Sequence, residues 1–351
     1  MSSPTLGPAV WSGGSRRLRS VGGVTTSAIG ELQEALGRVH GSTPQVASAW
    51  NELSAGYRGG RATLAGRRFT DAHARAYAVG RAPATAAAVG AVIGEVCERM
   101  AHWSPTTMID VGAGLGTASW AAMEIVPSLA RVELIERSEA MIELGQELAV
   151  HSTRPSIAAR TWRRADVSDL GEHRADVVLA GYVLSELDEQ ASVAAVDAWW
   201  AATTGELVIV DTGTPAGFAR MLDARGRLLD TGAHLVAPCP SAGACPMVGS
   251  DWCHFSVRLE RSDAHRRLKG AELPFEDEKF SYLVASRSGV TPARGRVVRH
   301  PQTRSGHIRL QVCHDGEISE QVVGKSRGDL YRWARKAAWG DAAPADLLDH
   351  E

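Results

Sequence analysis

A glycine-rich segment between a short apolar strand and a helix limits the folds open to this chain more than any other feature. The apolar run 107–111 is followed at once by Gly112, Gly114 and Gly116. Apolar runs and helical stretches then alternate along the chain, at 132–136, 139–150, 176–180, 189–202 and 206–211. Strands that alternate with helices in this way predict an α/β, Rossmann-like fold with a parallel sheet built from strand–helix–strand units.

The pattern divides the chain into four predicted parts. Residues 1–23 are small and polar without periodicity, which predicts disorder. Apolar residues at helical spacing predict a helical N-terminal region over 24–103. The Rossmann-like domain is expected over 104–287, with a cysteine-rich insert at 237–256. Residues 288–351 are basic and punctuated by glycines, which predicts a small β module that ends in a helix.

Composition indicates a globular protein. The 38 Lys and Arg residues against 40 Asp and Glu give a formal net charge of −2, and 44% of residues are hydrophobic. These values exclude a basic coat protein and an acidic disordered chain, and they allow a sizeable core. The sequence has no apolar run of about eighteen residues for a membrane span, and it begins without a secretory signal pattern. We therefore expect a soluble intracellular protein, a monomer with no membrane partner.

Acidic residues follow the glycine segment at the spacing that a nucleotide-type ligand needs. Asp110 ends the first strand, Glu136 ends the second, and Asp166 follows the predicted third. Glycines let the backbone approach a ligand, and a carboxylate after the second strand can accept hydrogen bonds from a ribose. Asp166 could reach an adenine amino group. The pattern D-x-G-x-G-x-G with two further acids resembles the class I S-adenosylmethionine-dependent methyltransferases.

That resemblance implies a set of residues around the methyl donor: Asp110, Gly112, Ala113, Gly114, Gly116, Glu136, Arg137, Asp166, Val167 and Tyr182. Catalytic residues are not predicted, because the fourth strand lacks the Asn/Asp-Pro-Pro-aromatic motif of enzymes that methylate base amines. Tyr182 and Glu186 could face the donor, although core packing and a solvated helix start explain them equally well. Cofactor binding is therefore better supported than methyl transfer.

Four of the five cysteines lie in the C-terminal third of the chain, at Cys239, Cys245, Cys253 and Cys313. Clustered thiols in an intracellular chain favour metal ligation over disulfides. Four thiolates suit either tetrahedral zinc or a four-iron cluster. The spacing lacks the C-x2-C pair of zinc ribbons, and Cys-Pro dipeptides recur among iron–sulfur ligands. The alternatives to Cys313 as fourth ligand are His254, His265 and His314.

The surroundings of these cysteines resemble one family over about residues 75–341. The matching strings are Pro238-Cys239-Pro240, Cys245-Pro246, Trp252-Cys253-His254-Phe255-Ser256 and Glu276 to Val284, with Arg81 to Thr85, Gly213-Thr214-Pro215 and Tyr331 to Asp341. They are similar to the mitochondrial small-ribosomal-subunit methyltransferase-like assembly factors (methyltransferase-like protein seventeen and its yeast and bacterial relatives). The resemblance implies an S-adenosylmethionine fold and binding to small-subunit ribosomal RNA during assembly. It also implies a 4Fe-4S cluster held by Cys239, Cys245, Cys253 and Cys313.

Two features depart from the family pattern. The N-terminus shows no mitochondrial targeting segment, which favours a bacterial cytoplasmic member, and Asp211-Thr212 stands where the family has Glu-Pro. Two functions stay open: an enzyme that methylates small-subunit ribosomal RNA or a ribosomal protein, and a non-catalytic assembly factor that keeps the cofactor pocket. Zinc in place of the cluster is a third alternative.

Positive charge is concentrated near the C-terminus, where 286–336 holds eleven Lys or Arg residues against four acids. Such a segment favours contact with a polyanion, through salt-sensitive phosphate contacts. A solvated charged face is the alternative. The predicted RNA-binding residues are Arg294, Arg296, Arg299, Arg304, Arg309, Lys325 and Arg327.

Overall fold

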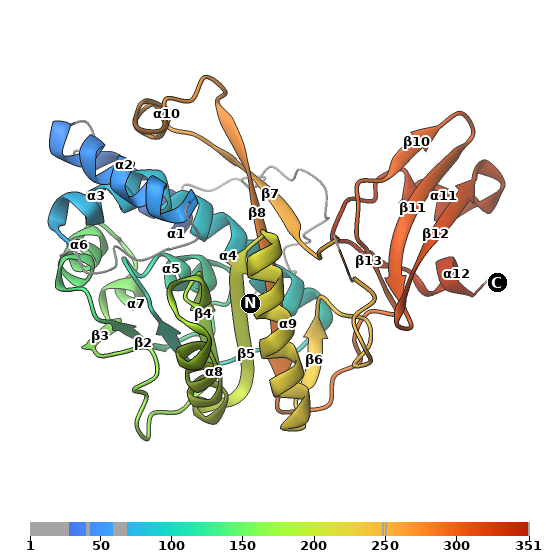
Figure 1. Ribbon diagram of the computed structural model, residues 1–351, viewed down its shortest axis with the longest axis horizontal. Helices are drawn as coiled ribbons and strands as arrows, with labels where there is room; N and C mark the ends of the chain where they lie inside the picture. Colours follow the sequence, from blue (N-terminus) through green and yellow to red (C-terminus); the bar gives the residue numbers. More distant parts are fainter. Residues whose placement is uncertain (1–27, 40–42, 59–68, 248, 250, 350–351) are drawn as a thin grey trace, which may run out of the picture.

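The computed structural model describes residues 28–39, 43–58, 69–247, 249 and 251–349. Residues 1–23, for which the sequence predicts disorder, lie outside this part of the chain. An α/β body is joined to a smaller β module that contains the C-terminus (Figure 1). The predicted α/β, Rossmann-like fold is confirmed.

Four helices occupy the N-terminal part of the chain: α1 (Ala28–Arg38), α2 (Pro44–Arg58), α3 (Asp71–Gly80) and α4 (Ala82–Arg99). The apolar stripe of α4, which includes Val89 and Ile93, is fully buried and packs on α5 (Thr117–Ile125). A Cβ atom at Gly80 would lie 2.4 Å from the Trp50 ring, so a glycine is required for α2 to approach α3 this closely. Within the described residues no single helix is long and apolar enough to span a membrane; α3 and α4 reach that length only as a pair bent by 53°.

Eight strands form the central sheet: β1 (Thr107–Val111), β2 (Arg131–Glu136), β3 (Thr161–Arg164), β4 (Ala175–Gly181), β5 (Thr203–Thr212), β6 (His234–Ala237), β7 (Phe255–Glu260) and β8 (Phe275–Ser286). Their order is β3-β2-β1-β4-β5-β8-β6, with β7 paired to β8. Strands β1 to β5 are parallel, whereas β8 runs antiparallel to β5, β6 and β7. The prediction of a parallel sheet is therefore wrong at this edge, because β8 is the returning strand of a hairpin with β7.

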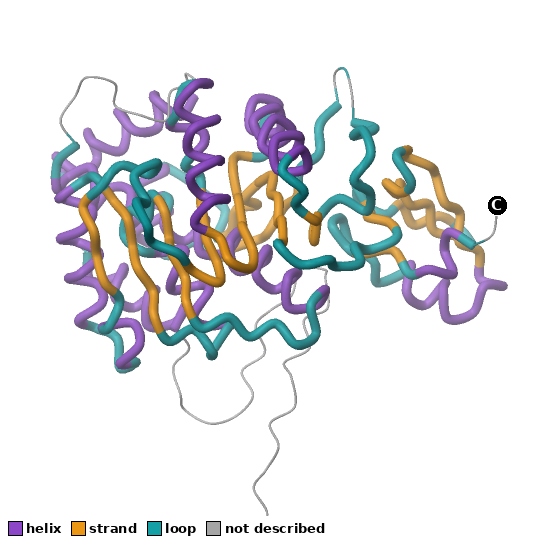
Figure 2. Tube along the Cα trace, turned by 90° about the horizontal axis from the view of Figure 1, so that it is seen from below, coloured by secondary structure: helices purple, strands orange, loops and turns teal. Residues whose placement is uncertain are grey.

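Helices cover both faces of this sheet (Figure 2). The helices that follow β1 are α5, α6 (Glu139–Val150), α7 (Pro155–Ala158), η1 (Leu184–Glu186), α8 (Glu189–Ala202), α9 (Pro215–Asp230) and α10 (Asp263–Lys269). One core cluster joins the sheet to the side of α4, α5 and α6, and another joins it to α8 and α9. The side chains of Ser138, Asp188 and Thr214 cap α6, α8 and α9 by accepting backbone N–H groups, as these residue types do at helix starts.

The C-terminal module contains a second sheet: β9 (Gly295–Val297), β10 (Gln302–Arg304), β11 (His307–His314), β12 (Glu317–Gly324) and β13 (Ala342–Ala343). Its helices are η2 (Lys325–Arg327), α11 (Gly328–Ala334) and α12 (Ala345–Leu348). Leu310, Val312 and Val323 are fully buried and form the centre of its own core cluster.

The β7–β8 hairpin extends past the central sheet as an arm that carries α10 at its tip (Figure 1). Leu268 of α10 packs against the cluster that holds Trp50 and Leu53, and Lys269 Nζ lies 5.6 Å from the centre of the Trp50 ring. The arm thus joins the sheet to the N-terminal helices and forms one wall of the space between them.

Candidate functional site

The glycine segment turns at the carboxyl end of β1 in a conformation that favours glycine. Gly112 and Gly116 have φ angles of 61° and 72°. A Cβ atom at Gly112 would lie 2.6 Å from Val183 Cγ2, and one at Gly116 would lie 2.6 Å from Leu134 Cδ2. Side chains at these positions would strain the backbone and collide with the core, which explains the glycines.

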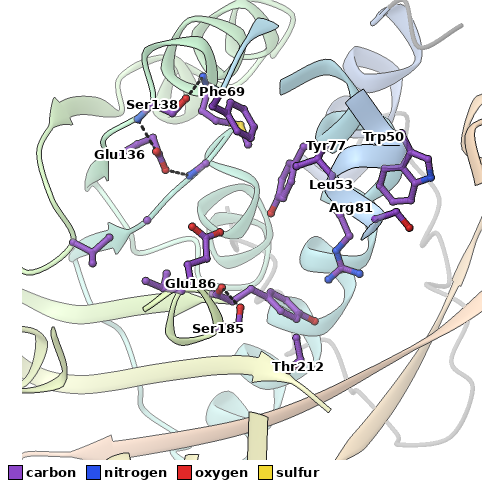
Figure 3. A pocket seen from close by; sticks show the side chains of 18 of the residues that line it. Trp50, Leu53, Phe69, Tyr77, Arg81, Glu136, Ser138, Ser185, Glu186 and Thr212 are labelled. Carbon is purple, nitrogen blue, oxygen red and sulfur yellow. Dashed lines mark hydrogen bonds between the residues drawn. The ribbon is translucent and has the colours of Figure 1, made fainter. Parts of the chain in front are cut away.

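A large cavity opens at the carboxyl ends of the parallel strands, bordered by α2, α3 and the arm (Figure 3). Its volume of about 1830 Å³ exceeds the roughly 300–1,000 Å³ of ordinary small-molecule sites. It therefore has room for a second group beside a nucleotide-type ligand. Seven predicted cofactor residues line it: Gly112, Gly114, Glu136, Arg137, Asp166, Val167 and Tyr182.

Three predicted cofactor residues, Asp110, Ala113 and Gly116, lie behind the wall of the cavity and do not line it. Asp110 is 1% exposed, and its Oδ2 accepts the Ser119 N–H at 3.1 Å. Arg160 Nη1 donates to Gly116 O at 2.9 Å. These residues support the loop, because β1 is a central strand and its last side chains point into the core.

Two acids predicted to bind a nucleoside are held in place by local hydrogen bonds. Glu136 accepts the N–H groups of Gly114, at 2.9 Å, and Ser138, at 2.8 Å, so its carboxylate bridges the first two loops. Asp166 accepts hydrogen bonds from the hydroxyl and backbone N–H of Ser168, and these lower the pKa of Asp166. Both carboxyl groups are fixed at the cavity wall before any ligand binds.

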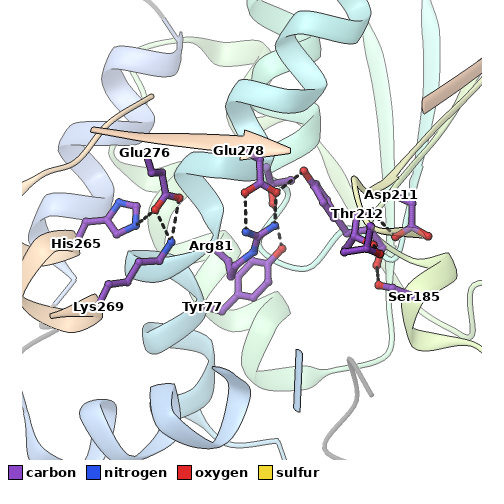
Figure 4. A network of polar contacts seen from close by, with 12 residues as sticks. Tyr77, Arg81, Ser185, Asp211, Thr212, His265, Lys269, Glu276 and Glu278 are labelled. Atoms are coloured by element: carbon purple, nitrogen blue, oxygen red, sulfur yellow. Dashed lines mark hydrogen bonds and ion pairs between the residues drawn. The ribbon is translucent and has the colours of Figure 1, made fainter. Parts of the chain in front are cut away.

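Tyr182 belongs to a buried network that the sequence did not reveal (Figure 4). Its Oη donates to Glu278 Oε1 at 2.8 Å, and Arg81 pairs with the same carboxylate through two hydrogen bonds, at 2.9 and 3.1 Å. Tyr182 also has a φ of 64°, which is rare for a residue other than glycine and typical of functional sites. Arg81 and Glu278 are 197 positions apart, and the family strings were the only signal for either.

Two more acids lie near the carboxyl ends of β4 and β5: Glu186 on η1, after β4, and Asp211 within β5. Glu186 is exposed at the cavity and its carboxylate points into it (Figure 3); loss of hydration there, and then the negative charge of Glu136, raise its pKa to about 7. A group with this pKa can take up or release a proton near neutral pH. Asp211, by contrast, is fully buried and accepts a hydrogen bond from Arg220 Nε at 2.8 Å.

A second polar cluster lies on the arm and holds α10 to β8 (Figure 4). Glu276 accepts hydrogen bonds from Lys269 Nζ at 2.8 and 2.9 Å, and from Arg261 Nη2 at 2.8 Å. His265 is 1% exposed, and its Nε2 lies 3.7 Å from Glu276 Oε2. Burial, followed by the charge of Lys269, lowers the pKa of His265 to about 4.

All four clustered cysteines line a second pocket, although they come from distant parts of the chain. Cys239, Cys245 and Cys253 lie between β6 and β7, and Cys313 lies on β11 of the C-terminal module. None of the three candidate histidines lines this pocket. All four cysteines are free thiols.

Apolar side chains complete the cysteine pocket, among them Phe218, Met247 and Val298. Burial raises the pKa of Cys253 well above its usual range and that of Cys313 to about 12, so both thiols hold their protons without a metal. Across the described residues, no three His, Cys, Asp or Glu side chains are grouped so that they could hold one metal ion. The four cysteines therefore border one pocket without forming a tight single-ion site among the described residues.

The predicted RNA-binding residues divide into three groups. Arg296 is 1% exposed, donates to Pro238 O and Gly340 O, and pairs with Glu95 at 2.8 Å. Its prediction as an RNA contact is wrong, because its guanidinium is part of the core. Arg304 and Lys325 are exposed and form no ion pair within the described residues; they lie at the same end of the module, where Lys325 N donates to Gly306 O.

The other four basic residues are engaged within the protein. The ion pairs are Arg294 with Asp349, Arg299 with Asp251 and Arg309 with Glu320. Arg327 Nη2 donates to Asp346 O at 2.7 Å. To contact a polyanion, these four arginines would have to give up the partners that they hold within the protein.

Comparison with known proteins identifies relatives along most of the chain. A family described as "Mitochondrial small ribosomal subunit Rsm22" matches residues 71–344. A human protein named "Ribosome assembly protein METTL17, mitochondrial" is 30% identical over 296 residues, which cover 79% of this chain and 63% of the human protein. The fission yeast "Rsm22-cox11 tandem protein 2, mitochondrial" is 27% identical over 290 residues, 68% of this chain. The chain spans only 38% of that yeast protein's length.

Solved structures show weaker similarity. An O-methyltransferase family protein from Burkholderia thailandensis matches with a TM-score of 0.42 and 15% identity, covering 74% of this chain and 72% of that one. Magnesium protoporphyrin IX methyltransferase from Synechocystis, solved with bound SAH, matches with a TM-score of 0.39 and 15% identity, covering 58% and 84%. Similarity at this level carries no functional conclusion.

These findings correct the expected location. The sequence favoured a bacterial cytoplasmic protein, but the matched family and the curated relatives are described as mitochondrial. They point to mitochondria and contradict the earlier expectation.

The pKa of Asp110 gives a prediction about stability. Burial raises it from 3.8 to about 7, so the folded protein keeps a proton that the unfolded chain releases between these values. The free energy of unfolding should therefore fall as the pH rises through this window. Asp110→Asn keeps an acceptor for the Ser119 N–H and removes the titration. Denaturant unfolding at a series of pH values should show wild type losing stability relative to Asp110→Asn from about pH 4 to pH 7. Parallel profiles would contradict this assignment.

Proposed function

The chain belongs to the mitochondrial small ribosomal subunit Rsm22 family, and we propose that it is an assembly factor of the small ribosomal subunit. In this proposal it binds S-adenosylmethionine in the large cavity and a 4Fe-4S cluster in the cysteine pocket. The observation that carries it is the extent of the family match, since 71–344 takes in most of the cavity, all four cysteines and most of the C-terminal module. The human relative is itself named a ribosome assembly protein.

The residues of the cavity fit a methyl donor of this type. Glu136 would accept hydrogen bonds from the ribose, Asp166 would reach the adenine amino group, and the close backbone at Gly112 and Gly114 would contact the methionine portion. The glycines at positive φ support this, because a side chain at Gly112 would fill the space beside Val183. Bound S-adenosylmethionine would supply an electrophilic methyl group.

The cysteine pocket favours an iron–sulfur cluster over zinc. A single zinc ion needs four sulfurs that all lie about 2.3 Å from one metal. The described residues offer no group of that kind, although four thiols line one pocket. A four-iron cluster holds its thiolates at the corners of a larger core and so needs a wider spacing. Bound, it would supply a fixed link between the body and the C-terminal module, and one-electron redox chemistry.

Contact with ribosomal RNA would use the exposed end of the C-terminal module. Arg304 and Lys325 are exposed there and could reach phosphates without giving up an acidic partner among the described residues. Phosphate contacts of this type make affinity depend steeply on salt.

Methyl transfer is a second candidate function, and Glu186 is the observation that favours it. Its pKa of about 7 and its position at the cavity suit a general base that takes a proton from an acceptor. Tyr182 is the other candidate for this role. Its hydroxyl is already hydrogen-bonded to Glu278, and the same carboxylate also pairs with Arg81.

The Arg304→Glu/Lys325→Glu variant should bind purified small-subunit ribosomal RNA more weakly than wild type at every salt concentration. Its plot of log affinity against log salt should be shallower by about two units, one for each lost phosphate contact. Filter binding across a salt series measures both. The matched control is Arg174→Glu/Arg267→Glu, which changes the charge equally at two exposed positions outside the module. Equal losses in both variants would contradict a specific RNA surface.

Glu136→Gln should bind S-adenosylmethionine about 10–100-fold more weakly, because a hydrogen bond to a charged group contributes about 1.5–3 kcal/mol. Calorimetric titration measures the affinity, and Glu189→Gln, at an exposed position at the start of α8, serves as the control. Unchanged affinity in Glu136→Gln would place the ribose elsewhere.

The same preparations separate the two functions. With labelled S-adenosylmethionine and small subunits from cells that lack this protein, the assembly-factor proposal expects no label on RNA or protein. Label that appears with wild type and is lost in Glu186→Gln would establish the methyltransferase instead.

Anaerobically prepared protein should be coloured by thiolate-to-iron charge transfer and contain about four irons per chain. Cys313→Ser should lose most of this iron, because it removes the ligand contributed by the module. Cys97→Ser should keep it, since Cys97 lies on α4 and does not line the pocket. A colourless wild type that contains zinc would overturn the iron–sulfur assignment.

A further inference from the structure

Two buried arginines share the pocket with the four cysteines. Arg225 comes from α9 and Arg296 from β9, and they are 8% and 1% exposed. Both are among the residues that line the pocket. Two guanidinium groups are an unusual lining for a pocket whose other walls are mostly apolar, because an unpaired buried charge is costly.

Each arginine braces a cysteine-bearing segment through backbone carbonyls. Arg225 Nη2 donates to Ser241 O at 2.8 Å and to Gly243 O at 2.6 Å, between Cys239 and Cys245. Arg296 Nε donates to Pro238 O at 3.0 Å, next to Cys239. The loop that carries Cys239 and Cys245 is therefore held by hydrogen bonds from two parts of the chain. Arg225 donates from α9 of the body, and Arg296 donates from β9 of the C-terminal module.

The hydrogen bonds and charges of these arginines are incompletely satisfied. Within the described chain, Arg225 Nε and Arg296 Nη2 are buried and have no hydrogen-bond partner. Arg296 has one acidic partner, Glu95, whereas no carboxylate in the described residues forms an ion pair with Arg225. Native proteins seldom leave buried donors and cations in this state, so the pocket lacks an anionic group.

We propose that Arg225 and Arg296 are positioning residues that neutralise an anionic metal–thiolate centre and hold it in the pocket. Four thiolates around a zinc ion, or around a four-iron core of charge +2, carry a net charge of about −2. The guanidinium of Arg225 supplies the missing positive charge, and the free N–H groups of both arginines donate to sulfur. This inference rests on the metal centre of the proposed function and holds for either metal.

Loss of this charge has two consequences. The centre is held less tightly, as is usual when residues that support metal ligands are replaced. If the centre is a 4Fe-4S cluster, one-electron reduction adds a further negative charge to an already anionic group. Removal of a nearby cation makes that step less favourable, so the reduction potential becomes more negative.

The test compares Arg225→Gln and Arg225→Lys with wild type, each purified anaerobically. Arg227→Gln is the matched control, because Arg227 lies on the same helix and pairs with Asp197 away from the pocket. Metal content, the rate of metal loss to a chelator, and the potential in a dithionite titration followed by absorbance are measured. Arg225→Gln should release its metal about 10–100-fold faster, and its potential should be more negative. Arg225→Lys keeps the charge and should recover most of both properties.

For Arg296 the double variant Glu95→Gln/Arg296→Gln removes the ion pair as a unit, so no unpaired carboxylate is left in the core. It should show the same direction of change, and circular dichroism checks that each variant is folded. A metal-loaded wild type whose Arg225→Gln and double variants retain metal like Arg227→Gln overturns this inference alone. A wild type that takes up neither iron nor zinc overturns the metal centre and this inference with it.

Discussion

The antiparallel pairing of β8 with β5, β6 and β7 is the interaction on which both pockets depend. The first half of β8 carries Glu276 and Glu278 to the large cavity, and residues 281–283 line the cysteine pocket. Its register is fixed by Phe280, which lies opposite Thr212 of β5 and Phe255 of β7. A shift of the β8 register by one residue would turn every β8 side chain to the other face of the sheet. Both pockets would then lose the side chains that β8 contributes to them. One strand thus sets the position of each pocket relative to the other.

The parts of the site that sequence could predict are those encoded locally. The turn after β1 needs glycines within a few residues of a buried strand, and Glu136 ends the next strand, so spacing alone identifies both. Three of the four cysteines, Cys239, Cys245 and Cys253, are recognisable because thiols are rare and these cluster in a Pro- and Gly-rich stretch. Their meeting with Cys313 in one pocket could be inferred only through the family resemblance, because no local rule brings β11 to the loop after β6.

Contacts between distant, irregularly spaced residues could not be predicted. The pairing of Arg81 with Glu278 leaves no periodic signal, since each residue by itself is an ordinary charged side chain in an element with mixed burial. Charge counting also failed for Arg296. A local excess of Lys and Arg says how much positive charge a segment carries, but it says nothing about which side chains face solvent. Asp110 shows the same limit, because a motif position identified it correctly as important but did not reveal that it supports the loop from behind.

The buried arginines of the body distinguish the two pockets physically. At the large cavity the half-buried Arg81 is matched by Glu278, and behind the glycine segment Arg160 faces the carboxyl of Asp110, which opposes the effect of burial on the pKa of Arg160. Arg81 thus has its counter-charge within the described chain, without a ligand in the large cavity. Arg225 has carbonyl partners but no acidic partner among the residues that the structure describes. A buried cation balanced only by carbonyl dipoles is destabilising unless an anion occupies the adjacent space. Occupation of the cysteine pocket by an anionic group should therefore stabilise the folded chain through Arg225.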